Sequence, residues 1–312
     1  MKYRFVSFTD LASILEEEGL TLESYGLARE SFISGKTEAA VTEELERRIW
    51  ITRASLDQGL RVAQHSLSGL TQGAAVKFAA SKRRLVGDGL FTRAISYSLA
   101  VNEVNACGGK VVAFPTAGSS GIIPGVLWAW WDTRGPGAST TGTVSKGAGS
   151  PQSCAGAGIE KLRGAFVNAS IVGVLIAQSA TLAGAEGGCQ AECGAAGAMA
   201  AAGLAYLEGM TLEDRFQAAA LSLKNSLGLA CDPVAGLVEV PCVKRNAFVA
   251  TNALTAVELV LSGIHSAIPF DEVVSAMKSI GDSLPQSLKE NSEGGLAITP
   301  TGLRCRKAMA GS

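Results

Sequence analysis

Four of the seven cysteines lie in the stretch from residue 184 to residue 245, and each has a glycine, a proline or an acidic residue beside it. They are Cys189, Cys193, Cys231 and Cys242. Turns of this composition free backbone N–H groups and can direct several sulfur atoms toward one point, as a thiolate-ligated metal requires. We therefore predict that cysteines of this stretch hold a metal centre.

The spacing of these cysteines argues against some kinds of metal centre. Cys189 and Cys231 are 42 residues apart, and Cys231 and Cys242 are 11 apart. No Cys-x-x-Cys pair occurs, which argues against a zinc ribbon or a ferredoxin-like electron carrier. Three separate thiolates would suit a [4Fe–4S] cluster with one open iron, a Lewis acid that can take a substrate hydroxyl. A single cysteine more often packs like alanine, and we interpret Cys107, Cys154 and Cys305 in that way.

A second candidate site is the loop from Pro115 to Gly121. Its N–H groups and hydroxyls could contact an anion, and the candidate residues are Thr116, Ala117, Gly118, Ser119 and Ser120. It is not a Walker loop, because Gly-x-x-x-x-Gly-Lys is absent. A small carboxylate or a capped helix would explain this composition equally well. Lys77, beside another glycine loop, is a further candidate for an anion, although solvated lysines are common.

Other ionisable groups give weaker signals. Lys244 and Arg245 directly follow Cys242 and could lower the pKa of a nearby thiol or orient a substrate, while a solvated or helix-capping pair is comparably frequent. The chain has only two histidines, His65 and His265, and a lone histidine near a helix end is more often structural than catalytic. No Ser/His/Asp arrangement can be assembled.

The composition excludes several classes of protein. The 312 residues are 47% hydrophobic and 18% charged, and 27 basic against 28 acidic residues give a net charge of -1. No basic face for nucleic acid is implied. An odd number of cysteines is no disulfide framework, and the first residues lack the apolar segment of a secretory signal, so we expect a cytoplasmic protein. The apolar run 165–184 contains Asn168 and Gln178, which favours a buried central helix over a membrane span.

The elements that must position these residues are predicted to be helices. A first helix is expected to start at Ser7 or Thr9 and to end at Gly19. Apolar residues recur at helical spacing in several further segments: 37–63, 89–106, 195–207, 211–223, 243–261 and 271–280. No period-2 strand pattern occurs. We predict one all-α domain over residues 1–312, with a Gly/Ser/Thr-rich surface loop or insertion at 132–157.

Taken together, several ordered blocks resemble the alpha subunit of the two-chain, iron–sulfur-dependent L-serine dehydratase (L-serine ammonia-lyase). The similarity covers nearly the whole chain, and long blocks of this kind are more specific than any single motif. The blocks are Asn102–Ala106, Pro115–Gly121, Gly184–Glu192, Leu229–Pro233, Pro241–Asn246, Gly294–Ala297 and Thr299–Gly302.

The resemblance implies an all-helical catalytic domain with a [4Fe–4S] cluster on Cys189, Cys231 and Cys242. The implied reaction is β-elimination of water from L-serine, in which the open iron takes the hydroxyl and a base removes the α-proton. The aminoacrylate product then tautomerises and hydrolyses to pyruvate and ammonia. The loop from Thr116 to Ser120 would hold the substrate carboxylate, and no pyridoxal phosphate would be needed.

The resemblance also implies a partner. In this family a Ser-Ser-Ser-His segment that supplies catalytic groups lies on a beta chain or beta domain, and this chain has no such segment. We therefore expect a hetero-oligomer with a beta subunit that carries the general base.

Three features depart from the family pattern. Gln72-Gly73-Ala74-Ala75 stands where the family has Gly-Gly-Asp-Ala, Cys193 replaces a valine, and the segment 132–157 occupies a region that is normally helical. Two alternatives to serine dehydration stay open. One is elimination from L-cysteine with release of sulfide, because an open iron could also take a thiolate. The other, suggested by the changes at Gln72 and Ala74, is a non-catalytic iron–sulfur or zinc-binding homologue.

Overall fold

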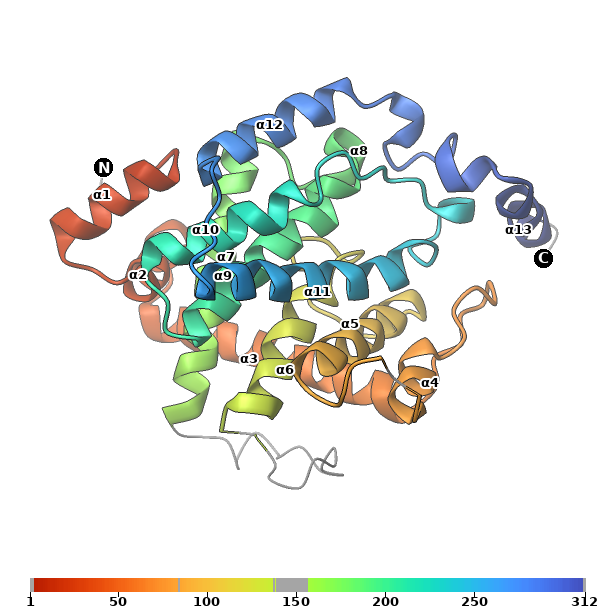
Figure 1. The fold of residues 1–312 in the computed structure, drawn as a ribbon, viewed down its shortest axis with the longest axis horizontal. Coiled ribbons are helices and arrows are strands. Elements are labelled where there is room, and N and C mark those ends of the chain that lie inside the picture. Colours follow the sequence, from red (N-terminus) through yellow and green to blue (C-terminus); the bar gives the residue numbers. More distant parts are fainter. Residues whose placement is uncertain (1–2, 84, 137, 139–156, 311–312) are drawn as a thin grey trace.

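The regular structure of the protein is helical (Figure 1). The computed structural model describes residues 3–83, 85–136, 138 and 157–310. Within these ranges there are thirteen α-helices and two isolated β-bridges but no strand, which confirms the predicted all-α class. The helices are α1 (Phe8–Glu18), α2 (Leu22–Ser34), α3 (Glu38–Arg61), α4 (Ala74–Ala80), α5 (Leu90–Ala106), α6 (Ile122–Arg134), α7 (Ala157–Ser179), α8 (Gly184–Gly187), α9 (Ala195–Leu207), α10 (Leu212–Lys224), α11 (Cys242–Leu261), α12 (Phe270–Ser283) and α13 (Pro300–Ala310). Short helices lie at η1 (Gln190–Gly194), η2 (Val234–Gly236), η3 (Gln286–Leu288) and η4 (Gly295–Ile298).

Several helix starts follow from local capping. Ser7, Thr37 and Thr211 each accept a hydrogen bond from the backbone N–H three residues later, at the starts of α1, α3 and α10. Such side chains satisfy N–H groups that have no partner inside the helix. Gly19 ends α1 in the left-handed conformation (φ +62°), as predicted.

One predicted helix end is wrong. The sequence predicts that α12 stops at Ile280 because Gly281 follows, but α12 continues to Ser283. Gly281 serves close packing instead, since a Cβ there would lie 3.0 Å from Nε2 of Gln190 and 3.1 Å from Cα of Gly187. The sequence analysis also did not predict α2, α4, α6, α8 and α13 as helices.

The core is centred on α9, which packs against α6, α7, α10 and α11. Small residues allow this crowding: a Cβ on Gly203 would lie 2.8 Å from the carbonyl oxygen of Ala165 on α7. The segment 158–179 of α7 is long and apolar enough to span a membrane by length and composition, and 67% of its most apolar window is buried inside the protein. The prediction of a buried helix in this region is confirmed.

The predicted loop 132–157 is helical at both ends. The structure places Asp132 in α6, which continues to Arg134, and α7 begins at Ala157. Asp132 is not a surface-loop residue, because its carboxylate accepts hydrogen bonds from Nη1 of Arg53 at 2.8 and 3.0 Å and from the Tyr97 hydroxyl at 2.8 Å. Residues 137 and 139–156, which include Cys154, lie outside the described residues.

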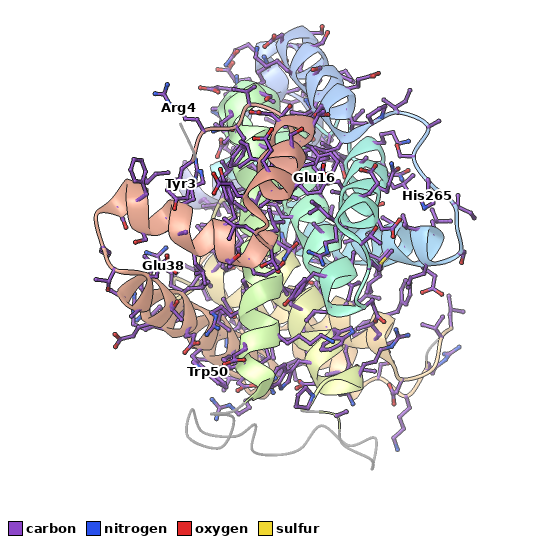
Figure 2. All side chains as sticks on the ribbon, turned by 90° about the vertical axis from the view of Figure 1, so that its left-hand side faces the viewer. Tyr3, Arg4, Glu16, Glu38, Trp50 and His265 are labelled. Atoms are coloured by element: carbon purple, nitrogen blue, oxygen red, sulfur yellow. The ribbon has the colours of Figure 1, made fainter. Side chains whose placement is uncertain are left out.

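The N-terminal face carries α1 and α2 in front of the core (Figure 2). The Tyr3 ring lies 5.8 Å from the Tyr25 ring and 5.1 Å from the Phe32 ring. Behind them α2 packs on both α3 and α7. This three-helix contact lies apart from the cysteines described next.

Candidate functional site

The four cysteines of the predicted centre come from three segments. Cys189 directly precedes the π-helix η1, which contains Cys193, while Cys242 is the first residue of α11. Gly188 has φ +74°, and a Cβ there would lie 2.8 Å from the carbonyl oxygen of Leu229. Only glycine fits both this conformation and this close approach, so Gly188 sets the direction in which the chain enters Cys189.

The turn at Cys231 is held by the segment that follows α12. The Cys231 N–H donates to the Leu288 carbonyl at 2.8 Å, and the Cys231 carbonyl accepts from the Glu290 N–H at 2.7 Å. The Asp232 carboxylate accepts from the Leu296 N–H at 2.7 Å. Residues close to the C-terminal helix therefore fix the position of Cys231, which the sequence analysis did not foresee.

A polar contact lowers the pKa of Cys189. Its pKa falls to about 7 because the Cys193 thiol donates a hydrogen bond to its sulfur and the Arg245 guanidinium lies beside it, against the opposing effect of burial. The pKa of Cys193 rises for the same reason, since its proton is held in that hydrogen bond. Arg245 is fixed by a bond from Nη1 to the Ala230 carbonyl at 2.8 Å and lies 3.8 Å from the Asp232 carboxylate.

Burial and neighbouring ionisable groups raise the pKa values of the other two cysteine thiols, Cys242 and Cys231. Burial and then the neighbouring Cys189 raise the pKa of Cys242 to about 12. Burial, the Glu192 carboxylate and Cys189 raise the pKa of Cys231, and the Cys231 sulfur lies 3.4 Å from Oε2 of Glu192. The structure thus brings Cys189, Cys231 and Cys242 around one buried region, together with Cys193.

The spacing of the donor atoms distinguishes two kinds of metal centre. Thiolates on one tetrahedral zinc ion, with Zn–S of about 2.3 Å, lie about 3.8 Å apart. Within the described residues, the group of three donors that lie within 4.8 Å of one another is Glu192, Cys231 and Glu290. Cys189, Cys231 and Cys242 do not form such a group, so at least one pair of their sulfur atoms is more than 4.8 Å apart, farther than two thiolates on one zinc ion. A polynuclear cluster, which separates its thiolates, fits this donor set.

The loop Pro115–Gly121 is held by two buried asparagines that the sequence analysis did not select individually. The side-chain amides of Asn102 and Asn246 both donate to the Gly118 carbonyl, at 2.9 and 2.7 Å. Oδ1 of Asn246 also accepts from the Gly121 N–H at 3.0 Å. Since Asn246 lies one turn after Cys242 on α11, one helix positions both a thiol and this loop.

The same loop borders the cysteines. A Cβ on Gly118 would lie 3.7 Å from Oε1 of Glu192 and 3.2 Å from Val238. Ser119 is buried and structural, because its hydroxyl donates to the Phe114 carbonyl at 2.9 Å. The Ser120 hydroxyl is buried and has no hydrogen-bond partner within the part of the chain that is described, so it retains hydrogen-bonding capacity beside the site.

The loop's other predicted members differ in position. Thr116 is half-buried, and its hydroxyl lies 3.2 Å from that of Ser119, whereas Ala117 is exposed. Lys77 is exposed on α4, which packs on α3 and α5, and no described contact links its ammonium to the loop. The structure therefore brings the loop, but not Lys77, to the cysteines.

Two buried carboxylates organise the region of Gln72 and Ala74. Glu239 accepts hydrogen bonds at 2.6 Å from each of three hydroxyls, which belong to Ser66, Ser68 and Thr71. Glu103 accepts from the N–H groups of Ala74 and Ala75 at 2.6 and 3.0 Å and so caps α4. The Gln72 side chain is exposed and donates to the Gly69 carbonyl.

Neither histidine belongs to the cysteine region. His265 is exposed on the loop after α11 (Figure 2), where Nε2 lies 3.3 Å from the Asp214 carboxylate. His65 is exposed, and its backbone pairs with Gln72.

Comparison with known proteins identifies the family of the chain. The family model described as "Serine dehydratase alpha chain" matches residues 17–297. The chain belongs to this family. Its relatives include the "Probable L-serine dehydratase, alpha chain" of Bacillus subtilis (strain 168), 39% identical over 98% of this chain and 96% of the relative. They also include the "L-serine dehydratase, alpha chain" of Peptoniphilus asaccharolyticus, 37% identical over 96% of each chain.

Longer relatives of this serine dehydratase alpha chain family match over part of their length. "L-serine dehydratase 1" of Escherichia coli (strain K12) is 34% identical over 95% of this chain, which covers 62% of that protein. These findings confirm the resemblance seen in the sequence and place the chain among lyases.

Proposed function

We propose that the chain is the catalytic alpha subunit of an iron–sulfur L-serine dehydratase, which removes water from L-serine and yields pyruvate and ammonia. The observation that carries the proposal is the convergence of Cys189, Cys231 and Cys242 beside the loop Pro115–Gly121. The family assignment and the names of the alpha-chain relatives support serine as the substrate.

Cys189, Cys231 and Cys242 would hold a [4Fe–4S] cluster. When bound, a cluster with one open iron supplies a Lewis acid for the substrate hydroxyl. Arg245 offsets part of the negative charge that three thiolates gather in a buried region. Because the Cys193 thiol donates its hydrogen bond to Cys189, we propose that Cys193 supports the ligand Cys189 and is not itself a ligand.

The loop would hold the carboxylate of L-serine. Its Gly118 carbonyl is turned into the protein by two asparagine amides, and the N–H groups of Thr116 and Ser120 already donate within the loop. The donors left for the carboxylate include the Ser120 hydroxyl, which has no partner among the described residues, and the N–H of Ala117. A fixed carboxylate orients the Cα–H and Cβ–O bonds for elimination. Loss of the α-proton and of hydroxide gives aminoacrylate and water, and hydrolysis of its imine tautomer gives pyruvate and ammonia.

The general base would come from a beta subunit. Both histidines of this chain lie outside the cysteine region. The names "alpha chain" of the relatives support a second chain in the active assembly. We therefore expect a hetero-oligomer in which the beta subunit covers the loop and delivers the base to the α-carbon of serine.

Iron and sulfide analysis after anaerobic purification tests the cluster assignment. We expect about four iron and four sulfide per wild-type chain and clear loss in Cys189→Ser, Cys231→Ser and Cys242→Ser. Cys193→Ala is the matched control, since it removes a buried thiol of the same region but no proposed ligand. A colourless protein that binds zinc, or loss of iron in the control alone, would overturn the assignment.

Turnover by the cluster-loaded chain with its beta subunit tests the reaction. Pyruvate from L-serine is the expected product. Sulfide from L-cysteine in place of pyruvate from L-serine would assign the alternative elimination, and an intact cluster without turnover of either would identify a non-catalytic homologue. Full activity of the alpha chain alone would refute the proposed role of the beta subunit.

A further inference from the structure

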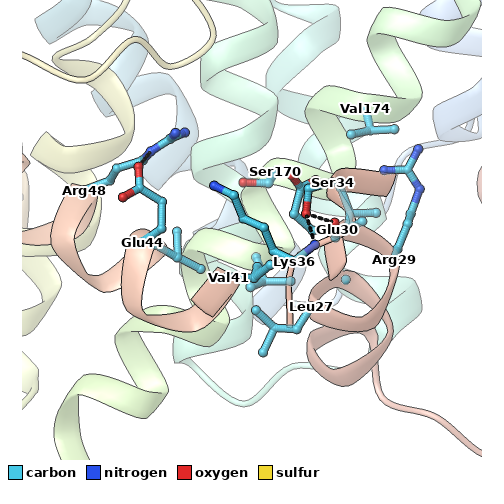
Figure 3. Close-up of a pocket in the computed structure, with 14 residues that line it drawn as sticks. Leu27, Arg29, Glu30, Ser34, Lys36, Val41, Glu44, Arg48, Ser170 and Val174 are labelled. Carbon is cyan, nitrogen blue, oxygen red and sulfur yellow. Dashed lines mark hydrogen bonds and ion pairs between the residues drawn. The ribbon is translucent and has the colours of Figure 1, made fainter. Parts of the chain in front are cut away.

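A cavity lies between α2, α3 and α7 and shares no lining residue with the cysteine region (Figure 3). Its volume is about 280 Å³. That is close to the lower end of the range for small-molecule sites, which starts at about 300 Å³. The cavity therefore suits a ligand of few atoms.

The floor of the cavity is aliphatic. Val41 and Leu45 share one face of α3, while Val167, Ile171 and Val174 share one face of α7. Gly26 brings α2 onto α7, since a Cβ there would lie 2.5 Å from Cγ1 of Val167. The aliphatic side chains of α3 and α7 thus form a surface in the pocket that can bury a short branched hydrocarbon.

The rim of the pocket carries both acidic and basic side chains, but its acidic residue on α3, Glu44, is already paired with arginines. The Glu44 carboxylate accepts hydrogen bonds from Arg47 at 2.7 and 2.8 Å and from Arg48 at 2.7 Å. The side-chain hydrogen bonds from Arg47 and Arg48 lower the pKa of Glu44 to about 2. Both oxygens of Glu44 are therefore occupied by cations of its own helix.

One cation on the α2 side, Lys36, remains available to a ligand, and a second, Arg29, is turned elsewhere. Lys36 extends over the pocket toward the Glu44–Arg48 pair (Figure 3), and the described residues offer its ammonium no hydrogen bond or ion pair. The guanidinium of Arg29 lies 5.1 Å from the centre of the Phe5 ring, and its Nε is buried without a hydrogen-bond partner among the described residues. Figure 3 shows this guanidinium pointing away from the Lys36 ammonium, so the two cations do not meet at one point of the cavity.

We propose that this cavity is a binding site for a small aliphatic carboxylate. The hydrocarbon would lie on Val41, Ile171 and Val174, and the carboxylate would accept a hydrogen bond from Lys36. An amine of the same shape would place its ammonium beside that of Lys36 and is disfavoured. A carboxylate without a hydrocarbon would leave the apolar floor uncovered and would bind more weakly.

Calorimetric titration of the full-length chain with 4-methylpentanoate tests the proposal. The matched probes are 4-methylpentylamine, which has the same hydrocarbon and the opposite charge, and acetate, which has the charge alone. We expect binding of 4-methylpentanoate in the millimolar range and none of either control at the same concentrations.

Two variants separate this site from general association with the surface. Lys36→Gln should weaken binding on the order of ten-fold by removing one charge-assisted hydrogen bond, whereas Lys82→Gln, at an exposed lysine outside the pocket, should not. Ser170→Leu should abolish binding by filling the cavity, and it breaks only a hydrogen bond within α7. Failure of 4-methylpentanoate to bind, or binding that survives both Lys36→Gln and Ser170→Leu, would overturn the proposal.

Discussion

Replacing Asn246 by alanine tests whether α11 positions the loop Pro115–Gly121. The change removes three hydrogen bonds of a fully buried side chain: to the Gly118 carbonyl at 2.7 Å, to the Cys242 carbonyl at 2.9 Å and from the Gly121 N–H at 3.0 Å. At about 1 kcal/mol each, the expected loss in the free energy of unfolding is about 3 kcal/mol. With an unfolding entropy of about 2.1 cal/mol/K per residue, this corresponds to a fall in Tm of about 5 °C for 312 residues.

Asn252→Ala is the matched control on the same helix. Its amide donates to the Ser222 carbonyl at 2.8 Å and to the Ser222 hydroxyl at 3.2 Å and does not contact the loop. The expected loss of stability is about 2 kcal/mol, close to that of Asn246→Ala. The two variants should differ in function, because only Asn246 fixes the Gly118 carbonyl.

The assays are thermal unfolding, iron content and serine-to-pyruvate turnover with the beta subunit. At equal iron content, Asn246→Ala should lower kcat/KM for L-serine at least about ten-fold, because misplaced binding groups lose that much or more. Asn252→Ala should leave kcat/KM near the wild-type value. Equal kcat/KM for both variants would refute the positioning role, and an unchanged Tm for Asn246→Ala would refute the stability argument.

Three further predictions concern other parts of the protein. Gly188→Ala should destabilise the chain more than Gly209→Ala and lower its iron content in anaerobic metal analysis. Both glycines have φ near +75°, but only at Gly188 would a Cβ meet backbone, 2.8 Å from the Leu229 carbonyl. Glu239→Gln should lower the free energy of unfolding by about 2 kcal/mol and make the segment 66–71 more sensitive to protease, because the acceptor of three hydroxyls loses its charge. The pKa of Glu44, measured by NMR, should be about 2 and should rise toward 4.5 in Arg48→Gln; its stabilising effect is present above pH 4.5 and is lost as the pH falls toward 2.

Features set by neighbours in the sequence could be predicted. Ser7, Thr37 and Thr211 cap helices through bonds that span three residues, so their sequence context contains both partners. The cysteines could be selected because a thiol beside Gly, Pro or an acid is unusual in a packed helix. The long helices followed from a period that their own residues display.

Features set by distant partners could not be predicted. The turn at Cys231 is held through backbone groups of Leu288 and Glu290, and every residue carries such groups, so no side-chain pattern marks the pairing. Glu239 was not selected because its three hydroxyl partners lie about 170 positions earlier in the chain. Gly281 was misread because a glycine can end a helix or allow close packing, and only the neighbour decides between them.

The first turn of α11 connects the cysteine region to the loop. Cys242, Arg245 and Asn246 are three and four residues apart and therefore lie on one side of the helix. Cys242 is the predicted ligand, Arg245 contacts Cys189, and Asn246 holds the Gly118 carbonyl. A rotation of this turn would move the thiol, the cation and the loop together. The position of the proposed substrate site relative to the proposed cluster is thus fixed by one rigid helical turn, and substitutions within that turn should affect both sites at once.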